Sequence, residues 1–338
     1  MSIKQLFVCK NLKTNSIIRL MNKEYKFIAL PENTGTRLDV FASSHVEDLT
    51  RSQAKKLIDS GMITVNGVIV KAHYLLHEKD IVKVTVPPQE KPAIAPEEIP
   101  LEILYQDDSL IIVNKPPGMV VHPGAGNFSH TLVNALAGMK YELSEGTHPL
   151  RPGIVHRLDK GTSGCLIVAK NNIIHHKLTA LFSGRNIEKE YLAIVANNVK
   201  LDYGEVKTLI DRCRRDRKRM AVATDKGREA VTHYEVIERF GFATYIRAFP
   251  KTGRTHQIRV HMSHLGNPLF GDCQYSRGKV EKSLGIEAPR LMLHAFHVNF
   301  MHPMTGQDMK FEAPIPHDFL LMLETLRNLY ADRMKKRR

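Results

Sequence analysis

Residues 156–164 read His156-Arg157-Leu158-Asp159-Lys160-Gly161-Thr162-Ser163-Gly164, and the chain continues as Cys165-Leu166-Ile167-Val168-Ala169. The second segment is a short apolar run, which predicts a buried strand. The first segment therefore forms the turn that enters this strand, and it places Asp159 between two cations, Arg157 and Lys160. A carboxylate that neighbouring cations keep ionised is suited to act as a nucleophile. An arbitrary aspartate in a turn is more often a structural salt-bridge partner, so the rest of the chain must decide.

The charge of the chain indicates a polyanionic partner. The 338 residues have a formal net charge of +14 at pH 7, which favours RNA, DNA or an acidic membrane. Basic side chains gather in residues 212–219 and 333–338. Neither cluster lies on a helix with a large apolar face, and Trp is absent, which disfavours a membrane surface. Each cluster alone fits a solvated loop or tail equally well.

The composition also narrows the class of protein. The length favours two domains, and no apolar run approaches the roughly 18 residues that span a bilayer. The N-terminus lacks the pattern of a signal peptide, so we expect a cytoplasmic protein. The four cysteines are far apart and the 17 histidines include no HExxH pattern, so we expect neither disulfides nor a metal site. Nothing demands more than a monomer.

Residues 24–88 predict a small α+β unit. Thr50-Arg51-Ser52-Gln53 matches a capping box that begins a helix, and residues 62–70 predict a hairpin with Asn66-Gly67 as its turn. Residues 24–30 and 80–86 predict strands. Arg51, Lys55 and Lys56 lie off the apolar stripe of the helix, which makes them candidate RNA contacts. From Gly35-Thr36-Arg37-Leu38-Asp39 through Val86, the unit resembles the S4 RNA-binding domain.

The chain thus divides into five predicted parts. A polar extension (1–23) precedes the S4-like unit (24–88), a proline-rich linker (89–100), a second domain (101–332) and a basic tail (333–338). In the second domain, strands alternate irregularly with helices instead of forming strict βαβ units. This order predicts an α+β fold with a mixed, mainly antiparallel sheet and flanking helices.

Four segments of the second domain form a recognisable set. They are Asp108-Ser109-Leu110 with Asn114-Lys115-Pro116-Pro117-Gly118 and His122-Pro123; Gly153-Ile154-Val155 with residues 156–164; Lys189-Glu190-Tyr191; and Lys251-Thr252-Gly253-Arg254-Thr255-His256-Gln257-Ile258-Arg259-Val260-His261, followed by Gly266-Asn267-Pro268 and Gly271-Asp272. In this order they resemble the ribosomal large-subunit pseudouridine synthases of the RluA/RluD type. The resemblance covers nearly the whole chain, including the S4-like unit.

The resemblance implies isomerisation of uridine to pseudouridine in structured RNA, typically large-subunit ribosomal RNA, without a cofactor. It also implies the role of each residue in the site. Asp159 matches the catalytic nucleophile, Arg259 its basic partner, and Tyr191 the aromatic face on which the base stacks. The resemblance leaves open whether Asp159 attacks the sugar C1′, attacks the base or abstracts a sugar proton. These roles agree with physical chemistry, because a buried carboxylate needs a cation to stay ionised and an arginine fork binds it in two places. The alternatives to these roles are a surface arginine for Arg259 and an ordinary core residue for Tyr191.

The remaining candidates have less certain roles. Arg157 matches the side chain that fills the space of a flipped base, although a phosphate contact or a structural ion pair fits it nearly as well. Lys115, Arg254 and His256 either hold backbone phosphates or support the site, and for His256 a structural role is favoured.

Two other functions remain alternatives. A pure RNA-binding module would have no need of Asp159 and Arg259, which are both present. A carboxylate-dependent N-glycosidase would break the same bond, but glycosidases usually use two acids. The motif offers one acid among cations, which favours the isomerase.

Overall fold

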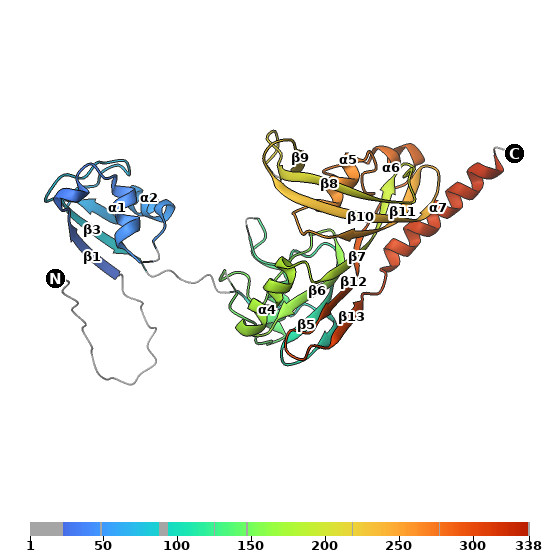
Figure 1. Ribbon diagram of the computed structural model, residues 1–338, viewed down its shortest axis with the longest axis horizontal. Coiled ribbons are helices and arrows are strands. Elements are labelled where there is room, and N and C mark those ends of the chain that lie inside the picture. Colours follow the sequence, from blue (N-terminus) through green and yellow to red (C-terminus); the bar gives the residue numbers. More distant parts are fainter. Residues whose placement is uncertain are drawn as a thin grey trace. The chain divides into compact units, whose positions relative to one another are not determined.

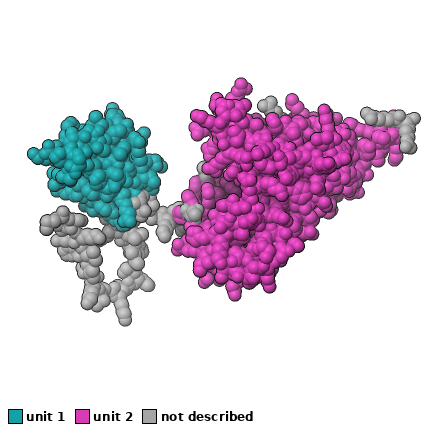
Figure 2. Space-filling view, viewed as in Figure 1, with its two compact units in different colours: residues 1–91 teal, residues 92–338 magenta. Residues whose placement is uncertain are grey.

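The computed structural model describes residues 23–336, except Asp48, residues 88–93, Ala125, Thr147, Lys218 and Arg277. The chain forms two compact units, residues 1–91 and 92–338 (Figure 2). The boundary between them falls inside the predicted linker. The predicted polar extension lies outside the described residues, apart from Lys23, which begins the first strand.

The first unit packs two helices on a three-stranded antiparallel sheet of order β1-β3-β2. Its elements are β1 (Lys23–Ile28), the short 3-10 helix η1 (Pro31–Asn33), α1 (Leu38–His45), α2 (Arg51–Asp59), β2 (Ile63–Val65) and β3 (Ile81–Val86). The predicted capping box is confirmed, because the Thr50 side chain accepts from the Gln53 N–H and the Gln53 side chain accepts from the Thr50 N–H. Leu38, Phe41 and Ile58 then supply the buried core between helices and sheet.

The predicted hairpin of residues 62–70 is only partly correct. Asn66 and Gly67 both have positive φ, 53° and 79°, as a tight turn requires, and Val65 and Val68 exchange backbone hydrogen bonds across it. No return strand follows, since Val68 forms an isolated bridge and residues 69 and 70 have no regular structure. Along its other edge, β2 pairs with β3, with Val65 opposite Val82.

The second unit is built on one large sheet of order β4-β5-β6-β12-β7-β11-β10-β8-β9, with β13 paired to β12. Its strands are β4 (Glu102–Gln106), β5 (Leu110–Lys115), β6 (Ser163–Ala169), β7 (Glu188–Ala196), β8 (Tyr203–Arg212), β9 (Met220–Ala223), β10 (Arg228–Arg239), β11 (Ala243–Pro250), β12 (Leu293–Met301) and β13 (Asp308–Glu312). Its helices are α3 (Leu132–Gly138), α4 (Asn172–Ser183), α5 (Gln257–His264), α6 (Lys279–Leu284) and α7 (His317–Lys335). Only β6 and β12 pair in parallel among the described strands. The predicted mixed, mainly antiparallel α+β fold is confirmed.

Strands β5 and β6 are covered on both faces, as their continuous apolar sequences predict. Ile111 and Val113 of β5 belong to the cluster that includes Leu132 and Leu136 of α3. Leu110 and Ile112 face the opposite cluster, which contains α4 and β13 residues. Figure 1 shows this half of the sheet with α4, and the other half with α5, on either side of the central strands β7 and β12. Close approach of β6 to β12 requires glycine at 164, because φ is +110° and a Cβ would collide with the Ala295 carbonyl.

The central strand β7 positions the helix that carries the predicted basic partner. Ala193 and Val195 on one face of β7 pack in the same cluster as Ile258 and Met262 of α5. The opposite face of β7 packs against α7. Since α5 is thus anchored through one apolar side, the neighbouring position Arg259 is directed away from that cluster, as the sequence predicts.

Two predicted boundaries need correction. Residues 95–97, assigned to the linker, pack on the second unit. The side-chain amide of Asn134 in α3 donates to the Ala95 carbonyl, and the main-chain carbonyl of Asn134 accepts from the Glu97 N–H. Residues 333–335, assigned to a basic tail, continue helix α7. The Arg333 guanidinium lies 4.7 Å from the centre of the Phe242 ring, so a cation–π contact favours this longer helix. Residues 337 and 338 lie outside the described part of the chain.

Candidate active site

A cavity of about 460 Å³ opens within the second unit beside Asp159. Four segments line it: the turn before β6, the end of α4, the start of β7, and the loop that leads from β11 into α5. Asp159 is the only carboxylate among the described residues that line the cavity. Its cationic lining residues are Arg157, Arg185, Lys189, Lys251, Arg254 and Arg259. The lining therefore suits a polyanion and presents a single acid to it.

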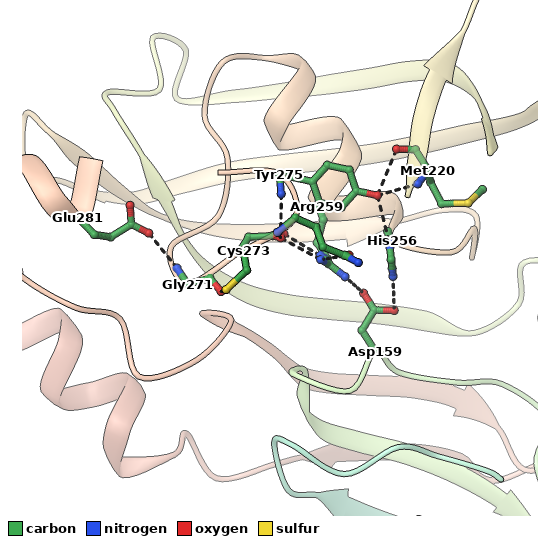
Figure 3. Close-up of polar contacts among 10 residues, drawn as sticks. Asp159, Met220, His256, Arg259, Gly271, Cys273, Tyr275 and Glu281 are labelled. Carbon is green, nitrogen blue, oxygen red and sulfur yellow. Dashed lines mark hydrogen bonds and ion pairs between the residues drawn. The ribbon is translucent and has the colours of Figure 1, made fainter. Parts of the chain in front are cut away.

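Asp159 and Arg259 meet in this cavity although 100 positions separate them in the chain. The Arg259 Nη1 donates to Asp159 Oδ2 at 3.0 Å, and the Asp159 side chain is 17% exposed. Figure 3 shows the carboxylate at the end of the guanidinium, with its second oxygen turned toward His256. The half-buried carboxylate is thus held through Oδ2, and Oδ1 carries the free lone pairs.

A second carboxylate, Asp272, holds Arg259 from the opposite side. Arg259 donates from Nε to Asp272 Oδ2 at 2.7 Å and from Nη2 to Asp272 Oδ1 at 2.9 Å, and Nη2 also donates to the Gln274 side chain at 2.8 Å. Burial opposes the charge of Arg259, but the hydrogen bonds and charge of Asp272, and then of Asp159, raise its pKa above the ordinary value. Arg259 therefore remains a cation with a fixed direction.

His256 lies near the other carboxylate oxygen of Asp159, Oδ1. Its Nε2 is 3.9 Å from Asp159 Oδ1, and its Nδ1 is 3.0 Å from the Tyr275 hydroxyl. The residue adopts φ +56° and precedes the first turn of α5. Burial lowers the pKa of His256, the charge of Asp159 opposes this, and Arg259 adds to the lowering. The pKa of His256 thus lies below its ordinary value, and its hydrogen bond to Tyr275 fits the structural role predicted for it.

Tyr191 lies between the cavity and the core. It lines the cavity and also packs against two neighbouring apolar clusters, one with Ala193 and Val195 and the other with Leu158 and Ala295. Burial, and then the negative charge of Asp159, raise the pKa of its phenol. A neutral aromatic ring at the cavity wall fits the predicted stacking face, and its packing fits the alternative of a core residue as well.

Lys115 takes a different position from the one that a phosphate contact requires. Its side chain is fully buried, and its ammonium donates to the carbonyls of Pro116 and Met119 at 2.7 and 2.9 Å. Burial lowers the pKa of Lys115 to about 7. The phosphate contact predicted for Lys115 is therefore wrong, and the other predicted role, support of the site, fits these bonds.

The cavity is also lined by the two other arginines predicted for the site, Arg157 and Arg254. Arg157 is exposed at the rim of the cavity, and it forms no ion pair with a carboxylate in the part of the chain that the structure describes. Arg254 is partly buried and donates from Nε to the Glu229 carbonyl at 3.0 Å, which leaves its terminal nitrogens for another acceptor. The alternative of a structural ion pair thus loses support for Arg157.

The cations predicted on helix α2 differ in their environment. Arg51 donates to Asp39 at 2.9 Å, and Arg37 binds the same carboxylate. Hydrogen bonds from Arg37 and then from Arg51 lower the pKa of Asp39 to about 2, so Arg51 has a structural role in the first unit. Lys55 and Lys56 are exposed on the following turn.

Sequence reasoning missed several residues of the site. Asp272 appears in the quoted motif without a role, and Gln274 and Tyr275 follow it with no pattern that marks them. Lys189 also lines the cavity, where burial and then the charge of Lys251 lower its pKa to about 8.

The described residues contain no group of three or more His, Cys, Asp or Glu side chains that could hold a metal ion. No helix in the same ranges is both long and apolar enough to cross a membrane.

Comparison with known proteins identifies the family of the chain. Residues 109–264 match the family model of RNA pseudouridylate synthases, and residues 36–82 match the S4 domain. An RNA pseudouridine synthase of Bacillus subtilis, YlyB, is 42% identical over 299 residues, which cover 88% of this chain and 97% of the relative. The chain belongs to the RNA pseudouridine synthase family. It is therefore an enzyme with an added S4 domain, and the predicted family and RNA-binding character are confirmed.

Other members of the family extend this result. The ribosomal large subunit pseudouridine synthase D of Zymomonas mobilis is 41% identical over 307 residues, which cover 87% of this chain and 95% of the relative. Among solved structures, human RNA pseudouridylate synthase domain containing 4 aligns with a TM-score of 0.53 at 28% identity, covering 67% of this chain and 92% of the human chain. Membership of an enzyme family decides against the pure RNA-binding module.

Proposed function

We propose that this pseudouridine synthase modifies uridines of large-subunit ribosomal RNA and that Asp159 is its nucleophile. The observation that carries the proposal is the single carboxylate of a cation-lined cavity, held by an arginine that a second carboxylate fixes. The name of the Zymomonas mobilis relative supports the choice of ribosomal RNA. This substrate would place the enzyme in the cytoplasm.

The geometry supports different roles for the two carboxylate oxygens of Asp159. Arg259 occupies Oδ2 of Asp159, so Oδ1 is the oxygen that can react with the nucleotide. The guanidinium limits the rotation of the carboxylate, which favours attack in one direction. In the reaction, the bond between C1′ and N1 breaks and C5 bonds to C1′ instead. The proton lost from C5 is matched by one gained at N1, so the composition of the RNA stays constant.

The uridine must leave its stack to reach this oxygen. Unstacking costs roughly a few kcal/mol, which contacts at the cavity must offset. Tyr191 offers a neutral aromatic face at the wall, and the exposed Arg157 at the rim can fill the vacated space. The other cations of the lining are available for the phosphates on either side of the flipped nucleotide.

An N-glycosidase is less compatible with this cavity. Such an enzyme usually needs a second carboxylate beside the first, at about 5 to 9.5 Å. Asp272, the other acid near Arg259, does not line the cavity, and Arg259 and the N–H groups of Gln274 and Tyr275 occupy its oxygens. The described lining therefore offers no acid to activate a water molecule.

One experiment tests both the substrate and the reaction. Pseudouridines are mapped in large-subunit ribosomal RNA from cells with and without this gene, and the purified enzyme is then added to the unmodified RNA. We expect specific sites to disappear in the deletion strain and to return in vitro without release of free uracil. An unchanged ribosomal map would contradict the proposed substrate, and free uracil would show the glycosidase.

A further inference from the structure

Tyr275 joins the site to the arginine-rich loop that connects β8 with β9. The guanidinium carbons of Arg259 and Arg219 lie 5.0 and 4.9 Å from the centre of the Tyr275 ring. Arg259 is the partner of Asp159, whereas Arg219 is the last residue of the loop. One aromatic ring therefore contacts both a cation of the site and a cation of the loop.

The Tyr275 hydroxyl extends the same connection through hydrogen bonds. It accepts from the Met220 N–H at 2.9 Å, lies 3.2 Å from the Met220 carbonyl, and lies 3.0 Å from His256 Nδ1 (Figure 3). A phenol has one proton to donate. All three contacts are satisfied together when His256 Nδ1 carries a proton and donates it, while the hydroxyl donates to Met220. In the neutral imidazole, this arrangement leaves the lone pair of Nε2 directed toward Asp159.

The backbone of Tyr275 belongs to the turn that holds Arg259. Asp272 Oδ1 accepts from the N–H groups of Gln274 and Tyr275 at 3.0 and 3.2 Å, and it also accepts from Arg259. A shift of the Tyr275 ring would therefore move the carboxylate that directs Arg259. Tyr275 is therefore linked to Arg259 through this turn and its ring, and to His256 through its hydroxyl.

The loop at the other end of this connection suits contact with RNA. Residues 212–219 contain six arginines and lysines and one acid, Asp216. Arg214, Arg215 and Arg217 are exposed, and the loop is closed by a hydrogen bond from the Cys213 N–H to the Arg219 carbonyl. Exposed arginines on a short closed loop fit the phosphates of an RNA strand.

We propose that Tyr275 is a positioning residue that couples RNA contact at this loop to the orientation of Arg259 and His256 beside Asp159. The proposal rests on the proposed function, because it assumes that Asp159 is the reacting group. When phosphates hold the loop, Arg219 and Met220 are fixed, and through Tyr275 they fix the two side chains at the carboxylate. RNA that fails to engage the loop is then bound without full activity.

Two variants of Tyr275 separate its hydroxyl from its ring. Tyr275→Phe keeps the ring, and we expect a single-turnover rate at saturating RNA that is about 3- to 10-fold lower, the equivalent of one hydrogen bond. Tyr275→Leu also removes the contact with both guanidiniums, so its rate is lower still. The dissociation constant for large-subunit ribosomal RNA stays within about twofold in both variants, because phosphate contacts dominate affinity. Tyr105→Phe is the matched control, since it loses a hydroxyl bonded to Asp107 away from the cavity.

The decisive test combines Tyr275 with the loop. Replacing Arg214, Arg215 and Arg217 by alanine should weaken RNA binding and also lower the saturated rate. In the Tyr275→Leu background, the same replacement should weaken binding without a further loss of rate. Wild-type rates in both Tyr275 variants would overturn the coupling. It would also be overturned if the three arginine replacements lowered the rate in the Tyr275→Leu background by the same factor as in the wild-type background. If Tyr275→Leu does not fold, Tyr275→Phe is used as the background instead.

The same measurements keep the coupling apart from the proposed function. Rates that depend on Asp159 but not on Tyr275 reject the coupling alone. A wild-type rate in Asp159→Asn rejects the assignment of the nucleophile, whatever the Tyr275 variants show.

Discussion

Replacing Asp272 by asparagine changes one atom of the carboxylate that directs Arg259. The asparagine oxygen can keep the place of Oδ1, which accepts from Arg259 Nη2 and from two backbone N–H groups. Its amide nitrogen then takes the place of Oδ2 and faces Arg259 Nε. In the wild-type protein, this Nε donates to Oδ2 at 2.7 Å. The change thus removes one charged hydrogen bond and sets two donors against each other.

The size of the effect follows from the burial of the pair. The Asp272 side chain is 0% exposed and that of Arg259 is 9% exposed, so water does not replace the lost bond. A hydrogen bond to a charged group contributes about 1.5–3 kcal/mol, and we expect the free energy of unfolding to fall by that amount. A displacement of Arg259 by roughly 1 Å should in addition lower the single-turnover rate about 100-fold.

The chain supplies a matched control in Asp318. It binds Arg290 through the same two nitrogens, Nε at 2.6 Å and Nη2 at 3.0 Å, and neither residue lines the cavity. Denaturant titration and single-turnover assays at saturating RNA are carried out on both variants. Asp318→Asn should lose stability, less because its side chain is 35% exposed, and keep the wild-type rate. A wild-type rate in Asp272→Asn, or an equal loss of rate in both variants, would refute the role given to Asp272.

Three further predictions concern other parts of the chain. Deleting residues 1–91 should weaken RNA binding and reduce its dependence on salt, and an unchanged slope would count against RNA contacts by the first unit. Arg157→Ala should lower the single-turnover rate with little change in the salt slope; a slope reduced by about 0.7 with the rate intact would instead show a phosphate contact. Burial lowers the pKa of His294 to about 4, so stability is lost as pH falls below the unfolded value near 6.5. His294 contributes about 2 kcal/mol to the loss between pH 7.5 and 5, and the loss measured by denaturant titration should be smaller by about that amount in His294→Gln.

Local patterns in the sequence predicted local structure well. The capping box at Thr50 and the Asn66-Gly67 turn depend on contacts within a few residues, so neighbouring residue types are sufficient to predict them. Asn171 caps α4 through a similarly local contact, by accepting from the Ile174 N–H at 3.0 Å. The missing return strand after Val68 shows the limit, because the turn residues predict the reversal of the chain but not how far the pairing continues beyond Val68.

The site could be predicted only where a known motif covered it. Asp159 and Arg259 come from segments that no periodicity connects, and the resemblance to a family brought them together. Asp272 and Tyr275 lie in a loop after α5, where single residues make the decisive contacts and no repeat marks them. Lys115 was misjudged because lysine is rarely buried, and only the tertiary structure shows the carbonyls that accept from its ammonium.

The central claim is that Asp159 is the group that reacts with the nucleotide. The most direct test is the amount of pseudouridine formed by Asp159→Asn in a single turnover with saturating large-subunit ribosomal RNA. We expect a folded variant that binds the RNA with nearly wild-type affinity and forms no pseudouridine. Pseudouridine at the wild-type rate would contradict the account.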